Sequence, residues 1–162
     1  METLSLNDKL NSKLTNEKNE TNFWDIINDM NWYNVISSDT TLPNEYIKEY
    51  LIGFMDVNFV SEFKNFVVDR RKEIQENYLN LRNNTDYQPS TFIGNDNLWD
   101  VTASIVGMGK STYEMALKTP KFVEFIYQTK NYKENFEYGF DAAIYEINDL
   151  VYEWNKKQRN EG

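Results

Sequence analysis

The chain has 162 residues, 40% of them hydrophobic, and a formal net charge of −9. This length is typical of one domain with a sizeable core, and the 10 Phe, 11 Tyr and 4 Trp must supply much of that core. Cysteine and histidine are absent, which excludes disulfides, thiolate nucleophiles, Cys-ligated metals and Ser-His or Cys-His catalytic arrangements. We therefore expect no catalytic residue, no metal site and no cofactor.

The negative charge also restricts the partners. It would repel nucleic-acid phosphates and anionic lipid headgroups, so we expect neither nucleic acid nor membrane as a partner. No apolar run approaches the roughly 20 residues that span a bilayer, and the first residues lack the apolar core of a signal peptide. We expect a cytoplasmic protein whose acidic surface favours a basic protein partner.

The first third of the chain predicts an arm and two helices. Residues 1–20 are polar apart from a few spaced leucines, which is compatible with a polar arm or a short amphipathic helix. A first firm helix is expected to start at Thr21 or Asn22, either of which can cap it. A second is expected from Pro43, which suits a first helical turn, to about Phe54.

The longest helix is predicted in the middle of the chain, ending near Asn83. The basic residues Arg70, Arg71 and Lys72 break its apolar stripe, and we expect them on an exposed face, paired with neighbouring acidic residues. The stripe consists of apolar residues at helical spacing: Val60, Phe63, Val67, Ile74, Tyr78 and Leu81.

Three shorter helices are expected after this one. Residues 84–96 form the clearest loop, and Asn95 or Asp96 can cap a helix that ends around residues 107–109. A short helix over 111–118 follows, and Pro120 restarts another.

The last helix has the most regular pattern. Its apolar residues are separated by 4, 3, 4, 3 and 4 positions, which predicts one continuous apolar seam. These residues are Phe136, Phe140, Ala143, Ile147, Leu150 and Trp154. Together the segments predict an all-α, compact, single-domain bundle of about six to seven helices over residues 21–159, with an aromatic-rich core.

Two motifs invite a chemical interpretation. Gly109-Lys110-Ser111 matches the end of a phosphate-binding loop, but the first glycine of that motif is replaced by Ser104 and the preceding segment predicts a helix, so we interpret it as a helix-ending turn. The acidic residues Glu134, Glu137, Glu146 and Asp149 resemble paired metal ligands. They fall on one predicted helix and cannot converge on one ion, so we interpret them as a solvated acidic face.

One stretch resembles a bacterial family, the domain of unknown function 4240. Trp99, the Gly107-x-Gly109-Lys110 turn, the Tyr113-Glu114-x-Ala116-Leu117 string and Pro120 are similar to the family's aromatic helix, glycine–basic turn, Y-E-x-A-L string and proline. Phe23-Trp24-Asp25-Ile26-Ile27 is similar to its opening helix. The resemblance implies a compact helical domain that serves as an accessory or interaction protein in bacteria.

Three function hypotheses remain open. The first is an acidic, non-enzymatic protein-binding domain, an inhibitor or immunity-type protein that neutralises or regulates a partner in bacteria or phage. The second is a small-ligand-binding or enzymatic domain whose pocket forms around residues 94–113, with Asp96, Asp100, Lys110 and Tyr113 as its polar groups. The third is a self-associating module in which an exposed part of the C-terminal seam pairs with a second copy.

Overall fold

The structure, a computed structural model, describes residues 20–34, 43–134 and 136–161. The predicted N-terminal arm falls almost entirely outside the described residues. Seven helices in the described part confirm the predicted all-α fold. They are α2 (Glu20–Met30), α4 (Pro43–Ile52), α5 (Val57–Arg82), α6 (Asn95–Gly107), α7 (Lys110–Lys118), α8 (Phe122–Thr129) and α9 (Tyr138–Glu161).

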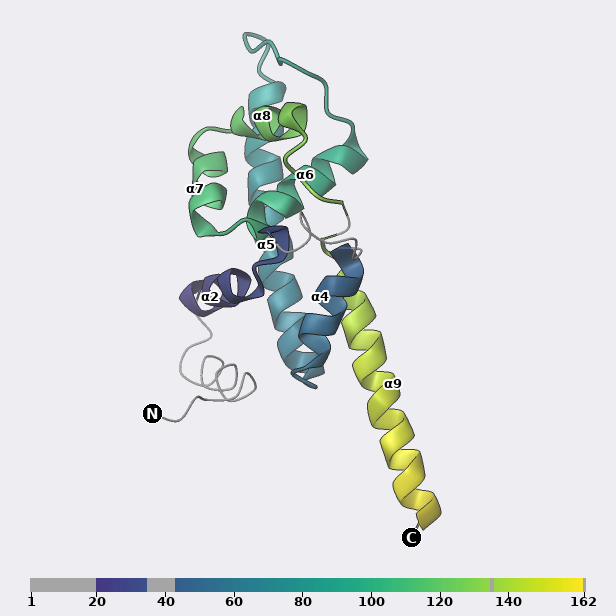
Figure 1. Ribbon diagram of the computed structural model, residues 1–162. Coiled ribbons are helices and arrows are strands. Elements are labelled where there is room, and N and C mark those ends of the chain that lie inside the picture. The colour runs from purple at the N-terminus through teal and green to yellow at the C-terminus, as the bar shows by residue number, and fades with distance from the viewer. Residues whose placement is uncertain (1–19, 35–42, 135, 162) are drawn as a thin grey trace, which may run out of the picture.

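Helix α5 is the central element, and the other helices pack around its two halves (Figure 1). Helices α6, α7 and α8 surround its C-terminal half, whereas α2, α4 and the start of α9 surround its N-terminal half. The distal part of α9 continues beyond α4, so that the C-terminus lies far from the other helices. No helix in the described ranges is long and apolar enough to cross a membrane.

An aromatic cluster forms the core, as the composition predicts. Phe23 stacks on Phe66 with ring centroids 4.7 Å apart, and Phe140 of α9 meets Phe63 of α5 edge to face at 5.5 Å. Such edge and offset contacts contribute beyond the area that the rings bury. The cluster joins α2, α5 and α9, which lie far apart in the sequence.

Local signals place most helix ends within a few residues of the predicted ones. The Asp56 side chain accepts a hydrogen bond from the Phe59 backbone N–H, which caps α5 at its start. Two predicted caps are wrong, because α2 begins at Glu20, before Thr21 and Asn22, and α6 is preceded by Gly94, which has no side chain to cap it. Extended backbone at Gly94 is enough to start that helix without a polar cap.

A glycine allows α4 and α9 to approach closely. A Cβ at Gly139 would lie 2.6 Å from Ile47 Cγ2 and 2.9 Å from the Asn44 carbonyl oxygen. Ile47 is fully buried, and its β-branched side chain has little freedom to move aside. The first turn of α9 therefore requires glycine at this position.

Candidate functional site

A buried ion pair ties the start of α9 to the middle of α5. Arg71 Nε donates to Glu137 Oε1 at 2.6 Å, and Arg71 Nη1 donates to Gln75 Oε1 at 2.9 Å. The Arg71 side chain is 2% exposed and that of Glu137 6%. The guanidinium carbon also lies 3.5 Å from the centre of the Trp99 ring on α6. Arg71 thus connects α5, α6 and the residue that precedes α9 through one planar group, which suits the rigid fork of arginine.

Burial and the arginine act on Glu137 in opposite directions. Burial raises the pKa of Glu137 above its ordinary value, and the Arg71 guanidinium opposes that rise through its charge and its hydrogen bond. The net direction is upward. Removing Arg71 would therefore lower the stability of the fold, because the Glu137 carboxylate would stay buried without a counter-charge.

An open groove of about 810 Å³ lies over this ion pair. Its rim carries two exposed aromatic side chains, Trp99 and Tyr138, and the ion pair between Lys64 and Asp141. The groove runs between α5, the exposed side of α6 and the first turn of α9. Its remaining lining is Val68, Lys72, Gln75, Glu76 and Leu79, in addition to Arg71 and Glu137. A volume of this size falls within the range of small-molecule sites.

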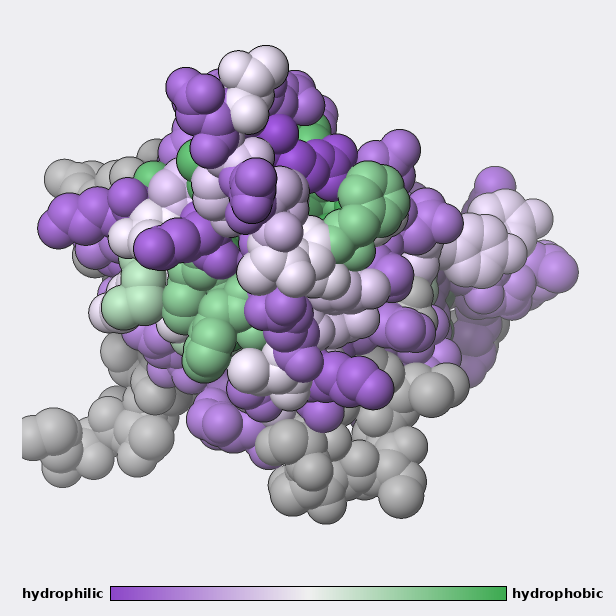
Figure 2. Space-filling model, turned by 90° about the horizontal axis from the view of Figure 1, so that it is seen from above, coloured by the Kyte–Doolittle hydropathy of each residue, from purple (hydrophilic) through white to green (hydrophobic). Residues whose placement is uncertain are grey.

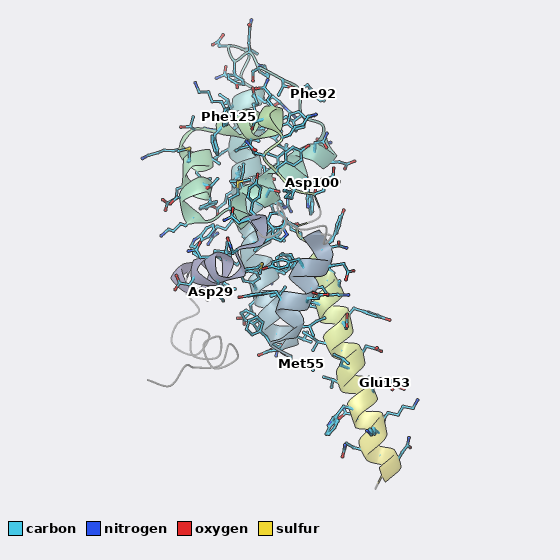
Figure 3. All side chains as sticks on the ribbon, viewed as in Figure 1. Asp29, Met55, Phe92, Asp100, Phe125 and Glu153 are labelled. Atoms are coloured by element: carbon cyan, nitrogen blue, oxygen red, sulfur yellow. The ribbon has the colours of Figure 1, made fainter. Side chains whose placement is uncertain are left out.

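The four polar residues predicted for a pocket around 94–113 lie in different surroundings. Asp96 is in the first turn of α6 and Lys110 begins α7, so the length of α6 separates them by about 16 Å at 1.5 Å per residue. Lys110 is exposed and forms an ion pair with Glu114 at 3.9 Å. Asp100 lies on the same helix as Asp96, one turn further on (Figure 3).

Tyr113, the fourth of these residues, has a packing role. Its side chain is buried, its ring lies 5.1 Å from that of Trp24, and its hydroxyl donates to Glu73 on α5. It therefore joins α7 to α2 and α5. Trp99, from the same stretch of sequence, lines the groove over the ion pair.

The turn that resembles a phosphate-binding loop joins two helices. Helix α6 ends at Gly107, and Gly109 has a φ of 114° just before α7. That backbone conformation favours glycine and allows the chain to reverse direction. The preceding helix differs from the buried strand that a phosphate-binding loop follows.

Two predictions about charged residues are wrong, and both concern the buried ion pair. Arg71 was expected on an exposed face but is buried, whereas Lys72 is exposed and Arg70 is partly exposed, with its Nη1 bonded to Glu73 Oε1 at 2.8 Å. Glu137 was expected on a solvated helical face, whereas it is buried just before α9 begins. Among the described residues, no three acidic side chains gather where they could hold a metal ion.

The sequence pattern contains a signal that Arg71 is buried. It follows Val67 by four residues and precedes Ile74 by three, so it occupies a position of the buried α5 stripe. A long basic side chain in that register predicts a buried acidic partner elsewhere in the chain. Nothing local identifies Glu137 as that partner, because it lies 66 residues further on.

A second buried glutamate fastens the 83–94 loop to α8. Glu124 accepts hydrogen bonds from the Tyr78 and Tyr87 hydroxyls, both at 2.8 Å, and from the backbone N–H and hydroxyl of Ser90, both at 2.7 Å. Burial alone would raise the pKa of Glu124, but these hydrogen bonds outweigh burial and lower it. Four donors converge on its two carboxylate oxygens, which is typical of a structural carboxylate.

Exposed hydrophobic side chains concentrate on α9. Of the eleven large ones among the described residues, six belong to this helix. Tyr138, Tyr145 and Tyr152 recur every seven residues and share one face, which we call the tyrosine stripe; they are 59%, 75% and 56% exposed. Leu150, Val151 and Trp154 lie on the opposite face, which we call the distal seam.

The upper end of the molecule differs from α9. Figure 2, seen from above, shows a face dominated by hydrophilic side chains, with separate hydrophobic areas between them. Phe92 and Phe125, both exposed, lie at this end (Figure 3). Hydrophobic residues scattered in this way are normal on a protein surface.

Comparison with known proteins finds no matching family model, no matching curated protein and no matching solved structure. The resemblance to the domain of unknown function 4240 therefore stays a prediction.

Proposed function

We propose that the chain is an acidic, non-enzymatic protein-binding domain of the inhibitor or immunity type, which neutralises or regulates a partner protein in bacteria or phage. The proposal rests on the tyrosine stripe. Three exposed tyrosines at heptad spacing form a line about 21 Å long, from Tyr138 to Tyr152, on a helix that extends beyond α4.

The stripe meets the groove at Tyr138. Trp99, 43% exposed, lies on another part of the groove lining, so one surface offers aromatic side chains from two helices. Tyrosine and tryptophan are enriched at the central contacts of protein interfaces because each combines a large apolar area with a polar group. The buried Arg71–Glu137 pair fixes the first turn of α9 against α5 and so holds the stripe in place before a partner binds.

Charge supplies the second part of the argument. A net charge of −9 attracts a basic partner at long range and raises the rate of encounter at low salt. Aromatic contacts then determine how long the complex lasts, because most differences in affinity lie in the dissociation rate. We therefore expect the partner to carry a basic surface around an apolar centre.

The groove supports a second candidate function, the binding of a small ligand. This candidate replaces the pocket predicted around 94–113 with the groove over Arg71 and Glu137, to which Trp99 contributes. A titratable group with a shifted pKa in a hollow of this size is a feature of ligand sites. Saturable binding of a small molecule that is lost in Trp99→Ala and kept in Tyr145→Ala would favour it.

The experiment for the main proposal is affinity capture from the native host with two matched variants. Tyr145→Ala combined with Tyr152→Ala removes two residues of the stripe, whereas Phe92→Ala removes an aromatic residue of the same 75% exposure as Tyr145 at the other end of the molecule. We expect the wild type and Phe92→Ala to capture the same partner, and the double variant to bind it at least about tenfold more weakly.

Two further measurements complete this test. Binding of the purified partner should weaken between about 50 and 200 mM salt, because salt screens the long-range attraction. Equal binding by the wild type and the double variant would contradict the proposal. Turnover of a substrate by the purified chain would contradict its non-enzymatic part.

A further inference from the structure

The Glu124 carboxylate is buried without a basic partner. Its side chain is 1% exposed, and its hydrogen-bond donors on Tyr78, Tyr87 and Ser90 are all neutral. Burial would raise the pKa of Glu124, but these hydrogen bonds lower it, so the carboxylate is ionised at neutral pH. No basic side chain in the described part of the chain forms an ion pair with it. Buried charges are normally paired, so this negative charge lacks the counter-charge that such a position calls for.

A groove with aromatic walls opens beside this charge. It has a volume of about 580 Å³, lies between α8, the end of α7 and the 83–94 loop, and includes Glu124 in its lining; we call it the α8 groove. Phe122 and Phe125 lie together in its lining, with ring centres 6.0 Å apart and planes 24° apart. Tyr87 and the exposed Met115 also line it, so Phe125, 55% exposed, has apolar neighbours here. The volume falls within the range of small-molecule sites.

We propose that the α8 groove binds a small organic cation whose nitrogen carries methyl groups, as in choline. Such a cation donates no hydrogen bond from its nitrogen, which suits Glu124 because four donors already occupy the carboxylate oxygens. The carboxylate attracts the cation through its charge, and the methyl groups pack against aromatic rings that favour a positive charge over their faces. The site goes beyond the proposed function, since Phe125 lies at the end of the molecule away from the distal part of α9 (Figure 3).

The groove over the buried ion pair is less suited to a cation, although aromatic and acidic side chains line it too. There the Glu137 carboxylate is bonded to Arg71 and the Asp141 carboxylate to Lys64, so both charges are already neutralised. The Arg71 guanidinium also covers one face of the Trp99 ring at 3.5 Å. The chain thus supplies its own cation to that groove, whereas it supplies none to the buried carboxylate of the α8 groove.

Lys121 is the unfavourable contact of this site. It lines the α8 groove one turn before Glu124, but it is exposed and forms no ion pair with that carboxylate. Its flexible stem allows the ammonium group to stay in water, where its repulsion of a bound cation is weak. Replacing this side chain by a neutral one of similar length, in Lys121→Gln, should therefore tighten the binding of the cation by about twofold.

Choline and its uncharged analogue 3,3-dimethylbutan-1-ol, in which carbon replaces the nitrogen, test the charge requirement on the full chain. Ligand-observed NMR titrations up to about 20 mM measure both affinities. We expect choline to bind with a dissociation constant of about 1 mM or below, and the alcohol to bind at least about tenfold more weakly, because it has the same shape without the charge. Equal affinities, or no saturable binding of choline, would overturn the proposal.

Three variants test the residues of the site. Glu124→Gln removes the charge and keeps the shape, so choline should bind about tenfold more weakly while the alcohol is little affected. Phe125→Leu keeps an apolar side chain and removes the ring, which should weaken choline about fivefold. Phe92→Leu is the matched control, because Phe92 is an exposed phenylalanine at the same end that does not line the α8 groove.

Circular dichroism shows whether Glu124→Gln folds. If it does not, Phe125→Leu decides, because its side chain is exposed and its loss leaves the buried hydrogen bonds intact. Wild-type affinity for choline in Phe125→Leu would overturn the proposal. Loss of choline binding in Trp99→Ala would place the cation in the other groove and would also overturn it.

A methylated ammonium group occurs both in free solutes and in the headgroup of choline lipids. Sedimentation with phosphatidylcholine vesicles distinguishes these two sources. Choline binding without vesicle binding would support the site and assign it to a free solute. Binding to both, with both weakened in Phe125→Leu, would support the site and assign it to the lipid headgroup.

These outcomes are independent of the partner experiment. The double variant Tyr145→Ala and Tyr152→Ala should bind choline like the wild type, because neither residue lines the α8 groove. Capture of a partner without choline binding would overturn the cation site alone. Choline binding without a captured partner would support the cation site and remove the proposed function.

Discussion

Phe140 and Trp154 lie on the same stripe of α9, two heptads apart, yet the first is fully buried and the second is 60% exposed. The difference comes from α4, which is 10 residues long and covers only the first half of a 24-residue helix. The same spacing therefore forms core at one end and a free surface at the other. A hydrophobic repeat indicates which face of a helix needs a partner, and the neighbouring elements determine whether this chain supplies it.

The largest expected effect is a difference in stability between alanine variants of these two residues. Phe140→Ala should lower the free energy of unfolding by about 4 kcal/mol, because it leaves a cavity between α5 and α9. Trp154→Ala should change it by less than about 0.5 kcal/mol at concentrations where the chain is monomeric. Urea denaturation of both variants checks the pair, and a comparable loss in Trp154→Ala would show that the distal half contributes to the core.

A second prediction concerns the Arg71–Glu137 ion pair, which lies next to the start of the buried half of α9. Arg71→Ala should cost about 3 kcal/mol at neutral pH, because it leaves the Glu137 carboxylate buried without its counter-charge. Adding Glu137→Gln to this variant should recover part of the loss, since the buried group is then neutral.

The pH dependence of the Arg71→Ala deficit has a definite sign. Burial raises the pKa of Glu137, and removing Arg71 removes the charge that opposes the rise. The folded state then binds a proton more tightly than the unfolded state, so stability relative to the wild type recovers as the pH falls. Denaturation at about pH 7.5 and pH 5 should show a smaller deficit at pH 5, and a constant deficit would exclude an ionised Glu137 as its cause.

The smallest of the three effects on stability tests the close contact between α4 and the buried half of α9. Gly139→Ala should destabilise by about 1–3 kcal/mol, because the new Cβ meets Ile47 and the Asn44 carbonyl oxygen. Helix propensity alone predicts the opposite sign, since alanine is a better helix former than glycine. Thermal denaturation distinguishes the two, and a stabilised variant would show that α4 lies less closely against α9 than in the structure.

The sequence by itself determined the helices. Apolar spacing identified α5 to within a residue at its end, and Pro43 and the glycines after α6 correctly marked a start and an end, because these signals act through the local backbone. Local spacing also placed Phe140 and Ile147 correctly in the core.

Only the tertiary structure decided which residues of these helical patterns are buried and which are exposed. Arg71 occupies a position of the buried stripe, and its exposure depends on Glu137, just before α9, and on Trp99 of α6. Leu150 and Trp154 continue the seam, and their exposure depends on where α4 stops. Both outcomes are set by contacts between residues far apart in the chain, which a local pattern of hydrophobicity and charge does not encode.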